Sequence, residues 1–220
     1  MTPKVELHFD FGSPNAYFAH KAIPAIEQRT GARFAYVPVL LGGVFKLTGN
    51  VAPMVAFKDV KNKLEYQRLE VVRFIAKHGL AKFKLNPHFP VNTVQIMRGA
   101  VAAEMDGNLA RYADAVFGHM WEEGRKMDDP EVIRAALDAA GLDGARILAR
   151  IQEQDVKDKL LKNTEGSVAR GTFGAPTFFV GEEIFFGKDR LRDVEEEILA
   201  AKGVRPVVSG IRARGSPGCP

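Results

Sequence analysis

Short strand patterns stand at both ends of this chain, and their order limits the folds that it can adopt. Val5–Asp10 is a short apolar run. Apolar residues then recur at helical spacing from Pro14 to Gly31, and Ala32–Val39 alternates apolar and polar positions and contains Phe, Tyr and Val. The N-terminal part therefore predicts strand, helix, strand, with a right-handed crossover that makes the two strands parallel.

The C-terminal part predicts a hairpin followed by a helix. Thr177–Val180 and Ile184–Phe186 are short and aromatic, and the Gly181-Glu182 pair between them suits a tight antiparallel turn. A helical pattern follows from about Arg190 to Ala201. These elements supply the second half of one small sheet, whose two halves lie far apart in the sequence.

Residues 54–164 are dominated by helical patterns. Asp129 followed by Pro130 is typical of a helix start, with the acid as cap and proline at the first helical position. The stretch Leu40–Pro53, which precedes these helices, is rich in glycine and turn residues. It predicts a long loop, and long loops within compact domains often carry function.

The order β-α-β, helices, β-β-α is that of a thioredoxin-like sheet, so we predict an α/β fold interrupted by an all-helical insertion. Residues 1–53 and 165–202 would form the discontinuous thioredoxin-like domain, 54–164 the insertion, and 203–220 a flexible basic tail. Thioredoxin-like sheets carry a proline, often cis, at the start of the third strand. Pro176 in "GAPTFF" occupies that place, so we expect a cis bond before it, although a proline there can also merely begin a strand.

Charge, cysteine and histidine content exclude several classes of function. The net charge is +4, but Arg205, Arg212 and Arg214 lie in the tail, and no basic stripe favours nucleic acid. The single Cys219 cannot form an internal disulfide, and the five histidines lack metal-ligand spacing, so we expect no metal. No apolar run approaches the ~18 residues of a membrane span. The sequence enters its first strand without a signal-peptide pattern, so we expect a cytoplasmic protein.

Ser13 stands where the first strand meets the first helix. The residues alone leave two interpretations open. Its hydroxyl can cap the helix, or it can hold a group at the helix N-terminus, where backbone N–H groups and the helix dipole favour an anion.

Five short motifs follow one another along the chain: Asp10–Phe18, Leu41–Asn50, Asn86–Thr93, Phe173–Val180 and Phe185–Leu191. In this order they resemble the 2-hydroxychromene-2-carboxylate isomerases and, equally, the kappa-class glutathione transferases. The resemblance covers about residues 5–202. The wider kin are disulfide oxidases of the DsbA type, which have a Cys-x-x-Cys motif where this chain has "SPNA".

The resemblance implies a glutathione site around Ser13, whose hydroxyl would donate to the glutathione thiolate. Asn50 would bond peptide-like groups of the cofactor, although by itself it suits a left-handed turn. The backbone of Ala175, next to Pro176, would pair with the cysteinyl part.

The turn before the last helix would receive the γ-glutamyl end of glutathione. Asp189 would accept from the α-ammonium group, and as an isolated residue it would be an N-cap of that helix. The turn consists of Phe186, Gly187, Lys188 and Asp189.

The second substrate implied by the resemblance is an anionic, aromatic 2-oxo acid or its ring-closed form. Its pocket would draw on Tyr17, Lys46, His88 and Phe89.

The function implied is that of a glutathione-dependent isomerase that interconverts 2-hydroxychromene-2-carboxylate and trans-o-hydroxybenzylidenepyruvate by reversible thiolate addition, as in naphthalene catabolism. The alternative is a kappa-like glutathione transferase that releases a conjugate. Thiol–disulfide exchange is disfavoured because no cysteine stands in the motif, and a non-catalytic binding module stays a further alternative. We expect no nucleic-acid or membrane partner. A homodimer is compatible with the resemblance, but the sequence does not determine the oligomeric state.

Overall fold

The structure is a computed structural model that describes residues 3–203. Of the predicted basic tail, residues 204–220 lie outside the described part of the chain. Within residues 3–203, no helix combines the length and the apolar character that crossing a membrane requires.

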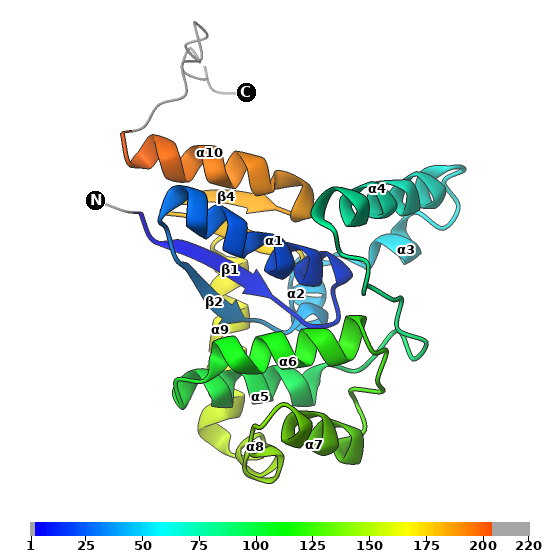
Figure 1. Ribbon diagram of the computed structural model, residues 1–220, viewed down its shortest axis with the longest axis vertical. Coiled ribbons are helices and arrows are strands. Elements are labelled where there is room, and N and C mark those ends of the chain that lie inside the picture. The colour runs from blue at the N-terminus through cyan, green and yellow to red at the C-terminus, as the bar shows by residue number, and fades with distance from the viewer. Residues whose placement is uncertain (1–2, 204–220) are drawn as a thin grey trace, which may run out of the picture.

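A four-stranded mixed sheet in the order β2-β1-β3-β4 forms the centre of the fold (Figure 1). β1 (Val5–Phe9) pairs in parallel with β2 (Phe34–Pro38) and antiparallel with β3 (Thr177–Val180), which forms a hairpin with β4 (Glu183–Phe186). Gly181 at the hairpin turn has a φ of 60°, which glycine adopts without steric cost. The predicted α/β fold, with helices inserted between β2 and β3, is confirmed.

Helices cover both faces of the sheet. α1 (Pro14–Thr30) and α10 (Leu191–Ala201) pack together on one face, and α9 (Gln154–Ala169) lies on the other (Figure 1). α1 ends as predicted at Gly31, which has a left-handed φ of 65°, and the helix continues through Pro24 without a break. The strand side chains alternate between these two helical layers.

The predicted loop Leu40–Pro53 is wrong, because most of it is helical. α2 (Leu41–Thr48) fills this stretch and is followed by the single turn α3 (Pro53–Ala56). Two distant side chains satisfy the start of α2: Asp10 accepts from the N–H of Leu41, and Thr164 accepts from that of Leu40. These tertiary bonds stabilise a helix start that the local sequence lacks.

Glycine in α2 also permits close packing against α9. A Cβ atom on Gly43 would lie 3.1 Å from the Cγ2 atom of Thr164. The glycine-rich stretch therefore marks a helix–helix contact and not a flexible loop.

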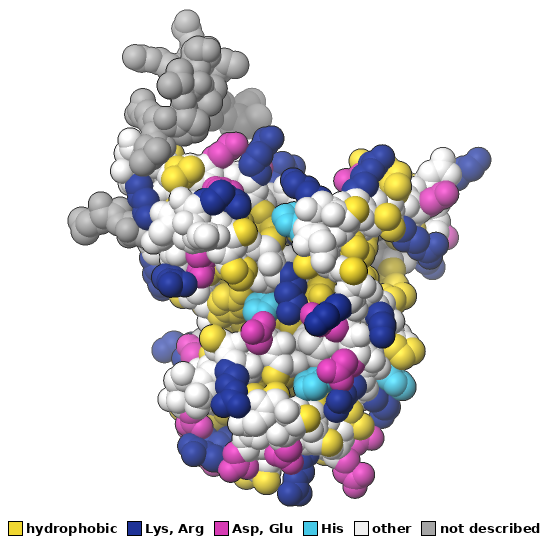
Figure 2. Space-filling view, viewed as in Figure 1, with side chains coloured by type: hydrophobic (Ala, Val, Ile, Leu, Met, Phe, Trp, Pro, Cys, Tyr) yellow, Lys and Arg dark blue, Asp and Glu magenta, His cyan; other side chains and the backbone are white. Residues whose placement is uncertain are grey.

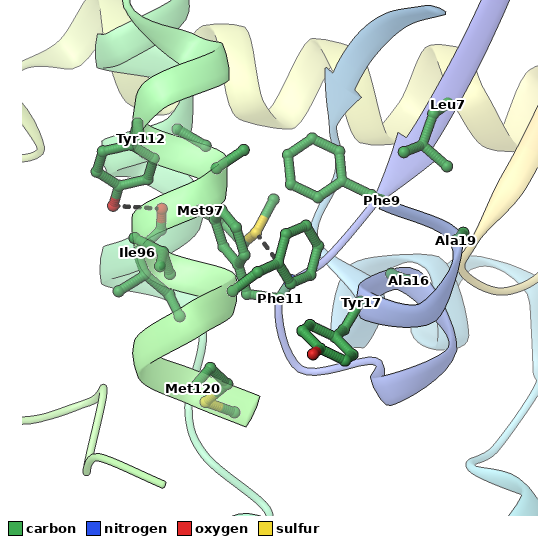
Figure 3. Packing of buried hydrophobic residues seen from close by; sticks show 14 of the residues in the cluster. Leu7, Phe9, Phe11, Ala16, Tyr17, Ala19, Ile96, Met97, Tyr112 and Met120 are labelled. Carbon is green, nitrogen blue, oxygen red and sulfur yellow. Dashed lines mark hydrogen bonds between the residues drawn. The ribbon is translucent and has the colours of Figure 1, made fainter. Parts of the chain in front are cut away.

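The inserted helices continue the hydrophobic core of the sheet domain. Phe11, which follows β1, packs edge-on against Phe117, and its backbone N–H contacts the sulfur of Met97 (Figure 3). Burying an aromatic ring of this size contributes roughly 1.5–3 kcal/mol. The other helices of the insertion are α4 (Lys63–His78), α5 (Val94–Met105), α6 (Leu109–Trp121), α7 (Pro130–Ala139) and α8 (Gly144–Arg150).

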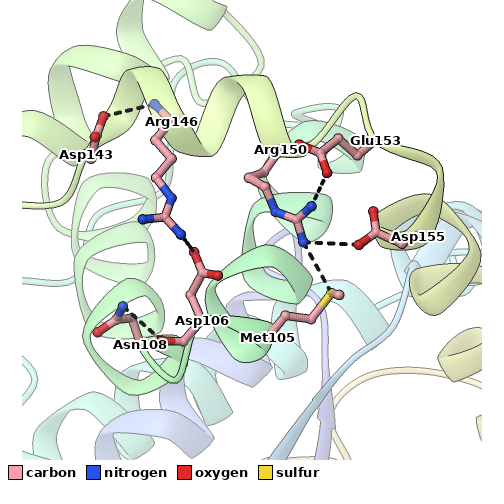
Figure 4. Close-up of polar contacts among 8 residues, drawn as sticks. All are labelled: Met105, Asp106, Asn108, Asp143, Arg146, Arg150, Glu153 and Asp155. Atoms are coloured by element: carbon pink, nitrogen blue, oxygen red, sulfur yellow. Dashed lines mark hydrogen bonds and ion pairs between the residues drawn. The ribbon is translucent and has the colours of Figure 1, made fainter.

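Ion pairs and helix caps stabilise the part of the insertion that lies farthest from the sheet. Arg146 bonds Asp106 at 3.0 Å and so ties α8 to the end of α5 (Figure 4). Arg150 pairs with Asp155 at 3.1 Å, and with Glu153. The predicted cap Asp129 accepts from the N–H of Glu131 at the start of α7.

α3 and α4 project from the rest of the molecule (Figure 1). Apolar and basic side chains mix on this projection (Figure 2). Its exposed apolar residues include Met54, Val55, Val60, Tyr66 and Val72.

Two helix glycines offer a test of the packing between α5 and α6. A Cβ atom on Gly99 would lie 2.1 Å from the hydroxyl oxygen of Tyr112, whereas one on Gly118 would meet no atom within 4 Å. We expect Gly99→Ala to lower the free energy of unfolding by about 1–3 kcal/mol, measured by chemical denaturation. Gly118→Ala is the matched control and should be neutral or stabilising by up to ~1 kcal/mol. Equal effects would contradict the close contact.

Candidate functional site

The segment Phe173–Pro176, which connects α9 to β3, receives hydrogen bonds from separate parts of the chain. The Ser13 hydroxyl donates to the carbonyl oxygen of Ala175 at 2.8 Å. The peptide bond between Ala175 and Pro176 is cis, as predicted. The start of α1 and the start of β3 therefore meet at a hydrogen bond.

Two other predicted site residues bond to the same segment. Asn50 Nδ2 donates to the carbonyl oxygen of Phe173 at 2.8 Å. The N–H of Gly187 donates to the carbonyl oxygen of Pro176 at 2.9 Å. Ser13 and these two residues thus bond three of the four carbonyl groups in this segment.

Ser13 caps α1, which confirms one of the two interpretations that the sequence left open. It is the N-cap of α1, with φ −94° and ψ 114°, and its Oγ accepts from the N–H of Ala16 at 3.3 Å. The same Oγ donates to Ala175, and the residue is only 5% exposed. The cap leaves the hydroxyl proton free to point at the cis-proline segment, so capping does not exclude a role in a site.

The carbonyl group of Ala175 is hydrogen-bonded, but its N–H group differs in this respect. The residue is buried, and within residues 3–203 this N–H has no hydrogen-bond partner. A buried backbone donor without a partner costs free energy, so it favours a ligand that offers an acceptor. An extended peptide supplies such acceptors.

Asn50 is anchored through its side chain, and the interpretation that its backbone is left-handed is wrong. The left-handed position is Gly49, with φ 67°, which ends α2. Asn50 follows this turn, is exposed, and also accepts from the N–H of Val51 through its Oδ1. Its amide is therefore fixed at the surface beside Phe173.

The turn before α10 holds an ion pair of adjacent residues. The ammonium group of Lys188 lies 2.5 Å from an Asp189 oxygen and 5.0 Å from the centroid of the Phe74 ring. Lys188 is buried, while the side chain of Asp189 is 69% exposed. The enclosed Lys188 ammonium group is already paired, whereas the exposed Asp189 carboxylate can accept from a ligand's ammonium group.

The interpretation of Asp189 as an N-cap is wrong. A 3₁₀ turn, η1 (Lys188–Arg190), precedes α10, so Asp189 lies inside a helical turn. Its carboxylate pairs with Lys188, and α10 begins after Arg190 without a side-chain cap.

Tyr17, predicted to line the second-substrate pocket, is enclosed in the core. It is 1% exposed, and its ring lies 5.7 Å from that of Phe83. Its hydroxyl donates to Glu122 at 3.1 Å, and burial together with this carboxylate raises the pKa of Tyr17, so the group stays protonated. In this arrangement the ring has almost no surface for a substrate.

The other predicted pocket residues lie on two separate segments. Lys46 is exposed in the last turn of α2. His88 is exposed, and Phe89 is half-buried with its ring 5.9 Å from that of Trp121. Among the described residues, neither Lys46 nor this pair has a hydrogen bond to the Phe173–Pro176 segment.

Asp10 is a buried acid beside Ser13 to which the sequence analysis assigns no role of its own. It ends the first strand pattern and opens the first motif, and in the structure it is 0% exposed and accepts a hydrogen bond from the N–H of Gly12. Burial raises the pKa of its carboxyl group, and hydrogen bonds from Leu41, Gly12 and Thr93 oppose that effect. A lone acid at the end of a buried strand was the available signal.

A surface cleft of about 590 Å³ lies on the α9 face of the sheet. None of the predicted site residues lines it. Its floor includes His8, whose Nδ1 lies 2.7 Å from the Ser167 hydroxyl oxygen and whose Nε2 has no hydrogen-bond partner in residues 3–203. Burial lowers the pKa of His8 to about 4, so its ring is neutral at pH 7.

Residues 4–199 match the family described as DSBA-like thioredoxin domain. The chain belongs to this family. The 2-hydroxychromene-2-carboxylate isomerase of Pseudomonas putida is 27% identical over 85% of this chain and 90% of its own length. Glutathione S-transferase kappa 1 of Rattus norvegicus is 26% identical over 96% of this chain and 98% of its own length.

Solved structures give the same fold. A 2-hydroxychromene-2-carboxylate isomerase superposes with a TM-score of 0.73 at 27% identity, covering 90% of this chain and 94% of the other. A probable DsbA oxidoreductase from Streptomyces coelicolor has a TM-score of 0.71 at 17% identity, covering 99% and 98%. The second likeness concerns the fold alone. The DSBA-like thioredoxin scaffold here therefore carries a serine and no cysteine at the start of α1.

The neutral state of His8 predicts how stability depends on pH. Its pKa is about 4 in the folded protein and about 6.5 when unfolded, so between these values only the unfolded chain binds the proton. We expect the free energy of unfolding to fall as the pH drops from 6.5 to 4, by at most ~3 kcal/mol from this residue.

His8→Gln should flatten this part of the stability profile, measured by urea denaturation at several pH values. The matched control is His88→Gln, which removes an exposed imidazole and should leave the slope unchanged. A wild-type slope in the His8 variant would show that other groups cause the loss.

Proposed function

We propose that this protein is a glutathione-dependent isomerase that interconverts 2-hydroxychromene-2-carboxylate and trans-o-hydroxybenzylidenepyruvate. One observation carries the proposal: the Ser13 hydroxyl lies at the N-terminus of α1 and bonds the residue before a cis-proline, in a DSBA-like thioredoxin domain. The isomerase relatives support the activity, and the geometry supports the way in which a thiol would be held.

The residues present fit glutathione at three points. The N–H of Ala175, for which residues 3–203 provide no acceptor, would pair with the cysteinyl part. The side-chain amide of Asn50 donates one N–H to the carbonyl oxygen of Phe173, and its remaining N–H would donate to a peptide group of glutathione. The exposed Asp189 carboxylate would accept from the ammonium group of the γ-glutamyl end, and backbone N–H groups of the turn Phe186–Asp189 would hold its carboxylate.

Ser13 would activate the sulfur by donating its hydroxyl proton. When bound, glutathione supplies the nucleophilic sulfur for reversible addition to the substrate's double bond and is not consumed. For Ser13 to donate to that sulfur, its hydroxyl proton turns away from the Ala175 carbonyl oxygen. A hydrogen bond to a charged group contributes roughly 1.5–3 kcal/mol, which corresponds to a thiol pKa lowered by about one to two units. The dipole of α1 acts in the same direction.

The second substrate, an aromatic 2-oxo acid, would approach from the outer side of Ser13. Lys46 offers a cation for its carboxylate, and His88 and Phe89 offer a polar group and an aromatic ring. We do not include the enclosed Tyr17 as a direct contact.

A kappa-like glutathione transferase that releases a conjugate is the second candidate. The rat kappa relative supports it, since it aligns over nearly the whole of both chains. Both activities use the same activated sulfur and differ only in the fate of the product. Following the absorbance of 2-hydroxychromene-2-carboxylate with and without glutathione tests the isomerase. Mass spectrometry of products from an electrophile such as 1-chloro-2,4-dinitrobenzene tests the transferase.

Ser13→Ala tests how the serine acts. A thiol tuned to a pKa near ~7 is about half ionised at pH 7, whereas one near ~8.5 is about 3% ionised, so we expect turnover to fall roughly fifteen-fold. The deficit should shrink as the pH rises toward 9, where the thiol ionises without help. The measurement is turnover against pH at a saturating glutathione concentration.

The stability of the variant separates this role from capping. Loss of the cap alone lowers the free energy of unfolding by ~1 kcal/mol and leaves turnover intact. A deficit that is constant with pH would mean that Ser13 positions the sulfur instead. Ser13→Cys is the control for redox chemistry and should not create a disulfide oxidase, because Ala16 provides no resolving thiol.

Asp189→Ala tests the γ-glutamyl end of the site. Because Asp189 is exposed and remote from the sulfur, its loss should raise the KM for glutathione several-fold while kcat changes little. Initial rates at varied glutathione concentration provide the measurement. Asp193→Ala, which removes an acid one helical turn further along, is the control. An unchanged KM in the Asp189 variant would exclude this residue from the site.

A further inference from the structure

The carboxylate of Asp10 is a buried junction of three chain segments. Its Oδ1 accepts from the N–H of Gly12 at 2.8 Å. Its Oδ2 accepts from the N–H of Leu41 at 2.7 Å and from the hydroxyl of Thr93 at 3.1 Å. Because the residue is 0% exposed, these three donors replace the water that would otherwise solvate the carboxylate.

Each of the three donors belongs to a segment that also contains or adjoins a predicted site residue. Gly12 immediately precedes Ser13. Leu41 is the first residue of α2, and Asn50 follows the end of that helix. Thr93 ends the connection that contains His88 and Phe89, and α5 starts directly after it.

Ser13 and Asn50 also bond one backbone segment, at positions two residues apart. Because α2 spans only Leu41–Thr48, the bond that holds its first residue contributes to where Asn50 lies. The Asp10 carboxylate is the direct bond between the turn that carries Ser13 and this helix.

We propose that Asp10 is a positioning residue of this site, whose carboxylate holds the Ser13 turn and α2 in the one arrangement that lets Ser13 and Asn50 engage the same peptide ligand. The inference concerns the arrangement of the apoprotein, and it rests on the proposed function only in naming glutathione as that ligand. Asp10 touches neither the sulfur nor the substrate in this account and acts through the groups that it orients.

The substitution Asp10→Asn keeps the shape of the side chain but replaces one of the two acceptor oxygens with an –NH₂ group. One amide oxygen cannot replace two carboxylate oxygens, and the –NH₂ group would face an N–H donor, from Gly12 or from Leu41. Thr93→Val removes only the third donor, and Thr93→Ser retains it. Tyr112→Phe is the control, because it keeps the ring that packs against Phe11 and removes only a buried hydroxyl, which bonds the carbonyl oxygen of Ile96 and not the Asp10 carboxylate (Figure 3).

The first measurement needs no ligand. In ¹H–¹⁵N spectra of the full chain, Asp10→Asn should shift the side-chain amide signal of Asn50 and the backbone signals of Gly12 and Ser13. Tyr112→Phe should leave these signals in place. An unshifted Asn50 amide in folded Asp10→Asn would overturn the inference. If Asp10→Asn does not fold, Thr93→Val takes its place and should shift the same signals in part.

The second measurement uses glutathione, titrated by calorimetry, with the thiol pKa of the bound form followed by thiolate absorbance. We expect Asp10→Asn to raise the Kd for glutathione about tenfold and to raise the thiol pKa toward its value in free glutathione. Thr93→Val should change both quantities in the same direction by a smaller amount. Thr93→Ser and Tyr112→Phe should behave as wild type. If Asp10→Asn were less stable than wild type but had the same Kd for glutathione and the same thiol pKa, the role of Asp10 would be purely structural. Failure of the wild-type protein to bind glutathione would refute the proposed function, while the ligand-free spectra would still decide the positioning role.

Discussion

The buried carbonyl groups between α9 and β3 need hydrogen-bond donors, and the residues that supply these donors form much of the candidate site. Gly174 and Ala175 are buried, and buried carbonyl groups are almost always paired. Thr177 donates to the carbonyl of Gly174, and Ser13 donates to that of Ala175. Because one of these donors comes from the first helix, satisfying this segment brings the two ends of the sheet domain together.

The inserted helices complete the turn that carries Ser13. The turn lies between β1 and α1, and in the part of the chain that the structure describes, side chains bond the N–H and the carbonyl group of its Phe11. Trp121 donates its indole N–H to the carbonyl of Phe11 at 2.8 Å, and Met97 contacts the N–H of the same residue. Both side chains belong to the insertion and are fully buried. The insertion therefore supports the site from behind, and the sheet domain alone would leave this backbone unsatisfied.

In the proposed function, the side chain at the start of α1 decides where the reactive sulfur comes from. A cysteine there becomes a reactive thiolate at a helix N-terminus. Ser13 has no such acidity, but its hydroxyl is a good donor that the cap bond with Ala16 keeps in place. In the proposed function the sulfur comes from glutathione and the protein provides the hydrogen bond. Under this proposal, a DSBA-like thioredoxin domain without a cysteine at this position would still hold a reactive sulfur at the start of α1.

The sequence by itself determined the elements that depend on neighbouring residues. The strand patterns, the stop of α1 at Gly31, the cap at Asp129 and the hairpin turn all follow from local periodicity and turn chemistry. The motifs also indicated Ser13, Asn50 and the cis bond before Pro176, although by resemblance and not by local physics.

Only the tertiary structure decided the features that depend on distant partners. α2 is helical because Asp10 and Thr164 satisfy its first N–H groups, and no local signal announces a donor or acceptor so far away in the sequence. Asp189 pairs with a neighbouring lysine and does not cap α10, because a 3₁₀ turn intervenes. Tyr17 is enclosed because inserted residues cover it. Burial and long-range hydrogen bonds arise only when separated segments pack, so residue patterns along the chain do not contain them.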